Sequence, residues 1–335
     1  MITIAPRAGA GTIRVLGTGA HLPAQVVTNA DVGEPAGVTD EWIVRKTGIR
    51  NRRWAKPYEA TSDLAVMAGR AALDDAGIRA ADLSLVVVAT STPDSPQPPT
   101  ACVVADELGT RPGTTAFDVN AVCSGFLFAL ATAQSILQGS DAGPALVIGA
   151  DIYSRILNPT DRRTAILFGD GAGAAVLGRS DNHKGQLIAT RLASFGGDRE
   201  LIEVPAGGSR MPATRETLAD GRHYFTMNGC GVREFIEDHV TPAIENFLAD
   251  NGLVGADVTR FVPHQANGRI LASMSAALRI SGTCSTFEEY GNTGSASVPV
   301  TLDHAARTGA LKTGDLVLLA AFGGGMTLGL ALLRW

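Results

Sequence analysis

Cys123 lies where a strand-like pattern changes into a helix-like one, a position suited to a nucleophile. Residues 117–120 alternate apolar and polar side chains, and residues 126–133 place apolar side chains at helical spacing. The amides at the start of a helix stabilise negative charge, so a cysteine there is expected to have a lowered pKa and to react as its thiolate. The alternative interpretation is a buried structural thiol, because free cysteine also packs as a small hydrophobe.

His264 and Asn292 are the other two side chains whose positions favour chemistry. His264 follows a short strand-like segment that ends at Pro263, and such histidines often face the crevice at the carboxyl edge of a sheet. Asn292 lies in a glycine-rich turn ahead of a helical pattern, where its carboxamide can donate into a site or cap the helix. A histidine satisfied within the core and a capping asparagine are the structural alternatives. The three glycines of residues 323–325 can turn backbone amides toward a ligand.

The elements that must position these side chains alternate between short apolar runs and helical patterns. Buried strands are predicted at residues 12–20, 83–91, 144–151, 171–178, 187–194, 259–265, 315–323 and 329–335. The clearest helices are predicted at residues 62–78, 232–252 and 267–280. This alternation favours a layered α/β fold whose central strands are largely parallel.

Two features bear on domain organisation. In each half of the chain a helix ends at a glycine, Gly77 or Gly252, and an Ala-Asp pair and a β-branched strand follow, which indicates a duplication. Residues 195–224 cluster Gly, Pro and charge without a period. They are expected to form a surface excursion near the mouth of a site or a plain exposed loop.

The composition excludes several functional classes. The chain has 335 residues, of which 45% are hydrophobic and 18% charged, and its net charge of −5 gives no sign of nucleic-acid binding. The four cysteines show no C-x-x-C spacing, so neither a metal site nor a disulfide framework is expected. No apolar run has the length of a membrane span and residues 1–11 do not resemble a signal peptide, so we expect a cytoplasmic protein. The glycine spacings at residues 17–23 and 169–173 do not match the dinucleotide-binding fingerprint.

Six motifs, taken together and in order, resemble the β-ketoacyl-acyl-carrier-protein synthase III family of the thiolase superfamily. They extend over essentially the whole chain: VTDEWIVRKTGIRNRRW, NAVCSGF, TDRRTAILFGDGAGAAVLG, FVPHQANGRI, YGNTGSASVP and AFGGGMTLG. The resemblance implies the thiolase fold, with two pseudo-duplicated α/β halves in a layered α-β-α-β-α arrangement. Residues 1–180 would form the half that carries the nucleophile, and residues 181–335 the half that carries the histidine and the asparagine. A homodimer is also implied.

The resemblance gives each of the three side chains a role. Cys123 would take an acyl group from an acyl-CoA starter and hold it as a thioester. His264 and Asn292 would donate hydrogen bonds to the oxygen of a malonyl thioester as it becomes an enolate. The backbone amides of Cys123 and Gly324 would form a second oxyanion hole. No metal or redox cofactor is implied, because decarboxylation supplies the driving force and the CoA thioesters are substrates.

A CoA-binding site is implied at Trp42, Lys46, Arg162, Gly229 and Asn267. Trp42 and Arg162 would sandwich the adenine ring, while Gly229 and Asn267 would flank the pantetheine arm. Lys46 stands where the family usually has an arginine, so it keeps the charge but loses the planar fork.

The acyl pocket and the docking face also depart from the family pattern. Pro98 stands where an aromatic side chain of the partner subunit often closes the acyl pocket, and Phe322 matches a phenylalanine that shields the active centre. Arg269 is expected to dock a malonyl-acyl-carrier protein. However, Ala276 and Ala277 stand where lysines are common, so electrostatic steering of an acidic carrier should be weaker.

The sequence therefore predicts an enzyme of the acyltransferase class. It would condense an acyl-CoA starter with a malonyl-carrier thioester in a decarboxylating Claisen reaction, which initiates fatty-acid or polyketide chains. The alternative keeps the acyl-Cys123 intermediate but transfers the acyl group to a non-malonyl acceptor such as an alcohol or an amine. A silent scaffold is disfavoured because all three reactive groups are present, and a thiolase because GGGMTLG contains no second catalytic cysteine.

Overall fold

The fold is built on one large mixed sheet in the computed structural model, which describes residues 1–4, 12–180 and 184–335. The ten strands follow the order β12-β13-β14-β9-β2-β8-β7-β5-β6, with β1 paired to β9. Their bounds are Ile2–Ile4 (β1), Ile13–His21 (β2), Leu85–Ala89 (β5), Thr115–Val119 (β6), Ala145–Asp151 (β7), Gly171–Arg179 (β8), Gln186–Ser194 (β9), Arg260–Pro263 (β12), Leu316–Gly323 (β13) and Thr327–Arg334 (β14). All of the predicted buried strands are present.

The sheet consists of two five-stranded groups that meet at a single point. One group contains β2, β8, β7, β5 and β6, and the other contains β12, β13, β14, β9 and β1. Between them, β2 and β9 share one register pair, Arg14 with Gln186. The division at residue 180 stays a prediction, because the next residues lie outside the described part of the chain and β1 of the first half pairs with β9 of the second.

The expectation of largely parallel central strands is wrong. Parallel pairs occur between β5 and β6, β5 and β7, and β12 and β13. In contrast, β2 with β8, β7 with β8, β13 with β14, and β14 with β9 are antiparallel. The turn between Gly323 and Thr327 is so short that it can only join antiparallel neighbours. The apolar pattern of the sequence does not show whether such a connection is a hairpin turn or a crossover between parallel strands.

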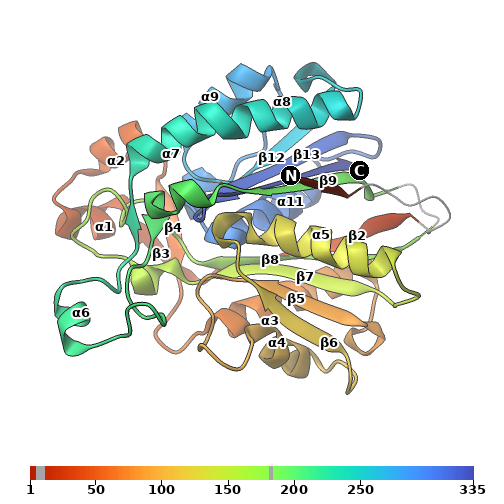
Figure 1. The fold of residues 1–335 in the computed structure, drawn as a ribbon, viewed down its shortest axis with the longest axis horizontal. Helices are drawn as coiled ribbons and strands as arrows, with labels where there is room; N and C mark the ends of the chain where they lie inside the picture. The colour runs from red at the N-terminus through yellow and green to blue at the C-terminus, as the bar shows by residue number, and fades with distance from the viewer. Residues whose placement is uncertain (5–11, 181–183) are drawn as a thin grey trace.

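Helices and strands alternate in five layers, as Figure 1 shows. Helices α3 (Thr61–Ala76) and α4 (Thr100–Leu108) cover the outer face of the first strand group. Helices α8 (Thr241–Asp250) and α9 (Gly268–Leu278) cover the outer face of the second group. Helices α5 (Gly125–Gln138) and α11 (Ser297–Arg307) lie between the groups. This confirms the layered α-β-α-β-α arrangement.

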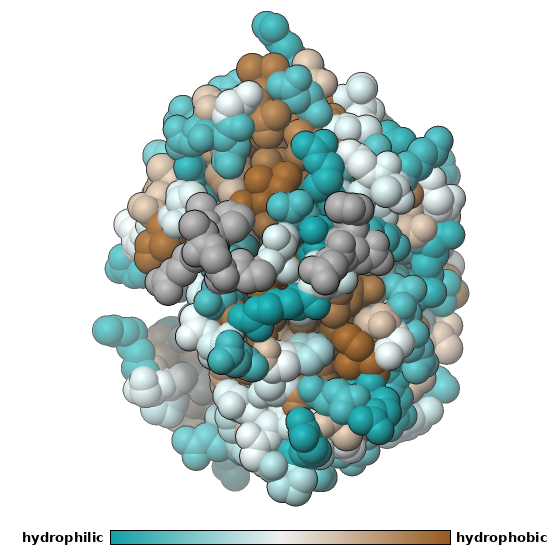
Figure 2. All heavy atoms as spheres, turned by 90° about the vertical axis from the view of Figure 1, so that its right-hand side faces the viewer, coloured by the Kyte–Doolittle hydropathy of each residue, from teal (hydrophilic) through white to brown (hydrophobic). Residues whose placement is uncertain are grey.

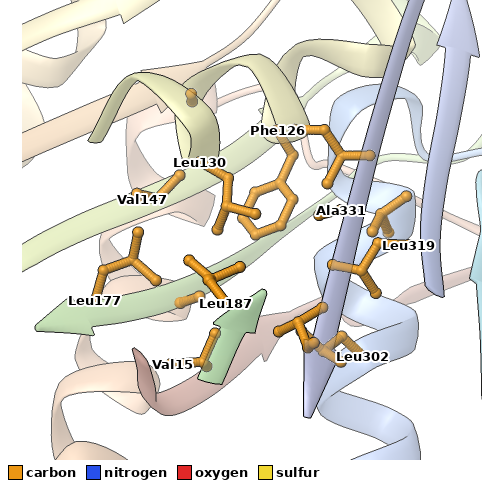
Figure 3. Packing of buried hydrophobic residues seen from close by; sticks show 14 of the residues in the cluster. Val15, Phe126, Leu130, Val147, Leu177, Leu187, Leu302, Leu319 and Ala331 are labelled. Atoms are coloured by element: carbon orange, nitrogen blue, oxygen red, sulfur yellow. The ribbon is translucent and has the colours of Figure 1, made fainter. Parts of the chain in front are cut away.

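The central layer is a single hydrophobic core. Phe126 and Leu130 of α5 and Leu302 of α11 pack against strand residues such as Val147 and Leu319 from both groups (Figure 3). Because α5 is enclosed by strands and by α11, it is apolar around most of its circumference. The two central helices begin next to each other at the site, since the turns that precede them are in contact.

The remaining elements lie around the edge of this core. They are β3 (Gln25–Thr28), α1 (Asn29–Ala36), α2 (Asp40–Thr47), β4 (Asn51–Trp54), β10 (Ile202–Glu203), α6 (Arg215–Ala219), β11 (Thr226–Met227), α7 (Gly229–Phe235) and α10 (Phe287–Tyr290). The helix predicted at residues 232–252 is present, but a π-helical turn over Ile236–Val240 separates α7 from α8, near Pro242, which lacks an N–H. Residues 195–224, expected to be irregular, contain the short elements β10 and α6.

In the face shown by Figure 2, hydrophobic residues form patches separated by hydrophilic ones. Among the described residues, no helix is both long and apolar enough to cross a bilayer. Part of the segment compared with a signal peptide, residues 5–11, lies outside the described residues.

Candidate active site

Cys123 lies in a strained elbow between β6 and α5. It is in the 3-10 turn Val122–Ser124, and Val122 has φ of 50°, which is rare for a β-branched residue. Hydrogen bonds within the elbow and to the first residue of β14 hold it in place: the Ser124 hydroxyl lies 2.8 Å from the Ala121 carbonyl oxygen and 2.7 Å from the Thr327 hydroxyl. Thr327 in turn donates to the Ala121 carbonyl at 3.0 Å. The backbone strain is thus located at the predicted nucleophile.

The glycine triplet packs directly against Cys123. A Cβ atom added to Gly323 would lie 2.7 Å from the Cys123 backbone nitrogen, so only glycine allows this approach. Gly324 follows and is buried, and its carbonyl oxygen accepts a hydrogen bond from Thr327 at 3.1 Å. The two residues predicted to supply the oxyanion-hole amides, Cys123 and Gly324, therefore lie on adjoining backbone segments.

His264 is held at the end of β12 with one ring nitrogen satisfied. Its backbone N–H donates to the Ala320 carbonyl oxygen at 2.7 Å, and Nδ1 lies 2.7 Å from the Ser297 hydroxyl. Phe322 contacts the ring edge-to-face with centroids 5.4 Å apart. The side chain is 2% exposed, and burial lowers the pKa of His264 to about 3, so the imidazole is neutral. Within the described chain, no residue hydrogen-bonds to Nε2.

Asn292 is fixed by its backbone and leaves its amide nitrogen available. Its N–H donates to the Leu167 carbonyl at 2.8 Å, and its carbonyl accepts from the Gly169 N–H at 3.0 Å. The side-chain Oδ1 accepts from the Gly294 N–H at 3.0 Å. No hydrogen bond to another described residue uses Nδ2. Because the N-cap of α11 is Ala296, the helix-capping interpretation of Asn292 is wrong.

Tyr153 is a site residue that the sequence analysis missed. Its buried hydroxyl hydrogen-bonds to Cys123 and lies 3.0 Å from the Ser91 hydroxyl. Its ring stacks on Phe168 at 4.6 Å and meets Phe225 edge-to-face at 5.6 Å. Tyr153 thus lies beside the sulfur, and two phenylalanine rings pack against it. Tyr153 comes directly after a predicted strand, and this position at a strand's carboxyl end is the signal that was available.

Asp151, also missed, ties the ends of the surrounding elements together. It is fully buried and accepts hydrogen bonds from the backbone N–H of Ser91 at 2.8 Å and of Ser295 at 2.7 Å. The hydroxyls of Thr90 and Thr92 also donate to it, at 3.2 and 3.1 Å. Burial raises the pKa of this carboxyl above its ordinary value. The contact with Ser295 links the end of β7 to the turn that carries the asparagine.

The expectation of a lowered cysteine pKa is wrong. Burial raises the pKa of the Cys123 thiol to about 12, and the nearby Asp151 adds to this shift, whereas the hydrogen bond from Tyr153 opposes it. A helix dipole contributes about 0.3–1 kcal/mol, which is too little to offset the removal of a thiolate from water. The resting Cys123 side chain is therefore a neutral thiol.

This raised pKa predicts how the acylation of Cys123 depends on pH. Since the thiolate is the reactive form, its fraction and the acylation rate should rise about tenfold per pH unit between about pH 6 and about pH 9. The rate is measured by quenching mixtures of protein and limiting acetyl-CoA and following the acylated mass. A plateau beginning near pH 7 would instead show that the pKa is low.

All five residues predicted to bind CoA line one surface pocket of about 610 Å³: Trp42, Lys46, Arg162, Gly229 and Asn267. Both the Lys46 ammonium and the Arg162 guanidinium lie 5.9 Å from the centroid of the Trp42 ring. The pocket therefore combines an aromatic face with positive charge, as a nucleotide with phosphates requires.

Two residues of the pocket wall are next to the buried histidine and asparagine. Leu167 lines it and accepts the backbone hydrogen bond of Asn292. Asn267 lines it three residues after His264, and caps α9 by accepting the Ile270 N–H at 3.1 Å. Sequence motifs far apart in the chain are thus brought to one site.

The remaining predicted residues lie at the periphery. Phe322 packs on the His264 ring, in keeping with a shielding position. The aromatic residue that contacts the cysteine is Tyr153. Pro98 is exposed on the loop before α4, so its place in a partner subunit's acyl pocket stays a prediction. The homodimer also stays a prediction. No group of three or more potential metal-binding side chains occurs within the described ranges.

Arg269 lines a smaller groove of about 340 Å³ between the π-helical turn and α9. Its Nε donates to the Arg45 carbonyl oxygen at 3.1 Å. The other cation of this groove, Arg233, lies 3.9 Å from the Glu237 carboxylate, and the floor includes Ala277. Of the two arginines of the groove, Arg233 therefore has a carboxylate beside it, and Arg269 is the one cation without a carboxylate partner among the described residues.

Two family profiles match the chain. Residues 117–196 match the profile of 3-Oxoacyl-[acyl-carrier-protein (ACP)] synthase III, and residues 248–335 match that of its C-terminal part. The "Acetoacetyl CoA synthase NphT7" of Streptomyces sp. (strain CL190) is 54% identical over 325 residues, which cover 96% of this chain and 98% of that protein. The "Beta-ketoacyl-[acyl-carrier-protein] synthase III" of Caldanaerobacter subterraneus subsp. tengcongensis is 42% identical over 323 residues, which cover 96% and 97% of the two chains.

A solved structure extends this similarity to the fold. The crystal structure of 3-oxoacyl-[acyl-carrier-protein] synthase III from Aquifex aeolicus VF5 aligns with a TM-score of 0.88 at 36% identity. The alignment covers 96% of this chain and 100% of that one. The layered architecture is therefore shared along nearly the full length of both proteins.

Proposed function

Because the chain belongs to the 3-oxoacyl-[acyl-carrier-protein] synthase III family, we propose that it condenses a short acyl-CoA with a malonyl thioester through an acyl-Cys123 intermediate. The observation that carries this proposal is the set of contacts that connects the pocket with the three side chains. The pocket residue Leu167 accepts the backbone hydrogen bond of Asn292, and the pocket residue Asn267 follows His264 by three residues. Phe322 packs on the His264 ring, and its neighbour Gly323 packs on Cys123. The Cys123 thiol loses its proton to water, and the thiolate attacks the thioester carbonyl. CoA leaves as a thiolate and takes up a proton. The amides of Cys123 and Gly324 stabilise the tetrahedral oxyanion.

The second half-reaction uses the two neutral donors. The bond between the malonyl carboxylate and its α-carbon breaks, CO₂ leaves, and the electron pair forms an enolate on the thioester. Nε2–H of His264 and Nδ2–H of Asn292 stabilise the enolate oxygen, and their lack of other partners keeps them available. The α-carbon then attacks the carbonyl of the acyl-Cys123 thioester, the bond from that carbonyl to the Cys123 sulfur breaks, and the β-keto product leaves. The Cys123 thiolate takes up a proton from water. Release of CO₂ supplies the driving force, so the proposal needs no resident cofactor.

A second candidate concerns the carrier of the malonyl group, which we propose to be CoA instead of an acyl carrier protein. The groove around Arg269 has its other cation beside Glu237 and has Ala277 in place of a lysine, so an acidic protein gains little from docking there. The relative from Streptomyces, named as an acetoacetyl CoA synthase, is in keeping with a CoA-linked product.

The test measures CO₂ release by the purified protein supplied with acetyl-CoA and one of two donors at equal concentration, malonyl-CoA or malonyl-acyl-carrier protein. Release with malonyl-CoA, and at least tenfold less with the carrier protein, supports both candidates. Release only with the carrier protein would overturn the second candidate and keep the first. Acylation of Cys123 without CO₂ release from either donor would overturn the condensation and favour transfer to a non-malonyl acceptor.

Tyr153 is expected to limit the length of the acyl group. Its ring occupies the space beside the sulfur, so Tyr153→Leu should improve acylation by butyryl-CoA relative to acetyl-CoA by about tenfold or more, since each methylene that a pocket admits is worth about 1–3 kcal/mol. The readout is the rate of mass gain with each acyl-CoA in separate incubations.

Tyr153→Phe is the matched control, because it removes the hydroxyl and keeps the ring. This variant should retain the preference of the wild-type protein for acetyl-CoA. If Tyr153→Phe shifted the preference as far as Tyr153→Leu, the hydrogen bond to Cys123 and Ser91 would be the determinant and not the volume of the ring.

A further inference from the structure

We propose that Ser297, the first residue of α11, holds His264 in the tautomer that carries its proton on Nε2. The inference rests on the proposed function, since it concerns the donor that faces the enolate. Ser297 is 1% exposed, and its hydroxyl oxygen lies 2.7 Å from Nδ1 of the imidazole. Ser297 is thus a positioning residue that acts through the histidine.

The direction of this hydrogen bond follows from counting protons. A serine hydroxyl carries one hydrogen, and within the described chain Nδ1 of His264 is its only hydrogen-bond partner. If Nδ1 carried the ring proton, it would donate to the hydroxyl oxygen and the serine hydrogen would be buried without an acceptor. An unsatisfied buried donor costs about 1–3 kcal/mol. The hydroxyl therefore donates to Nδ1, and the proton of the neutral ring is on Nε2.

The contacts around His264 and Ser297 restrain both side chains in this arrangement. Phe322 lies edge-to-face against the ring, and the His264 backbone is bonded to Ala320, so the ring has little room to turn. The serine is itself fixed, because its carbonyl accepts a hydrogen bond from the Thr301 hydroxyl at 2.8 Å one turn along α11. With Nε2 protonated, the histidine is a hydrogen-bond donor to the enolate and cannot take a proton from Cys123 at that atom.

The two half-reactions should therefore respond differently to Ser297→Ala. Loss of the contact removes the preference between the tautomers and the restraint on the ring, so decarboxylation of malonyl-CoA by the acylated protein should fall about 5- to 10-fold, the effect of one ordinary hydrogen bond. Acylation of Cys123 by acetyl-CoA should change less than about twofold. Ser297→Thr keeps the hydroxyl and should restore most of the rate.

Nitrogen NMR of ¹⁵N-histidine-labelled protein reads the tautomer directly, with the His264 signals identified by their absence from His264→Ala. In the wild-type protein Nε2 should be protonated and Nδ1 should show the shift of a hydrogen-bonded acceptor. In Ser297→Ala the Nδ1 signal should move toward the value of a free acceptor or toward a mixture of tautomers. Thr132→Val removes a half-buried hydroxyl that bonds only the Phe128 carbonyl within α5, so it should leave both signals unchanged.

Two outcomes would overturn the inference. The first is a wild-type spectrum with the proton on Nδ1, and the second is a Ser297→Ala protein whose His264 signals and decarboxylation rate match the wild type. Failure of the proposed function would look different. In that case the wild-type protein itself would release no CO₂, whereas the NMR signals would still report the tautomer.

Discussion

Cys123→Ala protein is expected to gain no acyl group from acetyl-CoA, and its condensation rate should fall by about 10⁴-fold or more, because the covalent intermediate cannot form. Cys123→Ser should also fail to acylate, because a buried hydroxyl is a weaker nucleophile than a thiol and no base contacts it within the described site. Intact-protein mass spectrometry after incubation with acetyl-CoA measures the effect.

Cys284→Ala provides the control for this experiment. Cys284 is partly buried away from the pocket, so its removal should leave the acyl group on the protein unchanged. Acylation that persisted in Cys123→Ala and disappeared in Cys284→Ala would show that Cys284, and not Cys123, is the nucleophile. A panel of acyl-CoAs in the same assay would also identify the preferred starter.

His264→Ala and Asn292→Ala are expected to separate the two half-reactions. Each variant loses one donor to the enolate oxygen, at a cost of about 2.7–4 kcal/mol, so decarboxylation should fall about 10²- to 10³-fold. Acylation should stay close to the wild-type rate, because these side chains do not contact the thiol proton in the proposed first step. The two rates are measured as CO₂ release and as mass gain.

The pH profile provides an internal check on the same experiment. Since burial lowers the pKa of His264 to about 3, the imidazole stays neutral above about pH 5, and decarboxylation by the pre-acylated protein should be nearly independent of pH from there to about pH 9. A loss of rate as the pH falls through about 6.5 would show that the histidine titrates normally. Variants that still condensed at the wild-type rate would contradict the roles given to both side chains.

The layered fold could be predicted because its signals are local. Apolar runs that cannot face water become buried strands, and α5 is apolar around most of its circumference because it lies between two groups of strands. The pairing directions were not predictable in the same way. Whether two strands run parallel depends on which strands become neighbours in the sheet, as with the antiparallel pair β7 and β8. The apolar pattern within a single strand does not show which strand will lie beside it.

Residue type and motif order were enough to predict which side chains can react and which motifs belong together, namely Cys123, His264, Asn292 and the five residues predicted to bind CoA. The protonation states of these side chains depend on how the chain packs. The thiol pKa is raised and not lowered, because burial is a property of the assembled layers and outweighs the local dipole. Likewise the tautomer of His264 depends on Ser297, which is 33 residues away along the chain. Residue type determines which reactions a side chain can take part in. Packing determines how far the side chain is removed from water and which groups contact it, and these two factors decide its protonation state and tautomer.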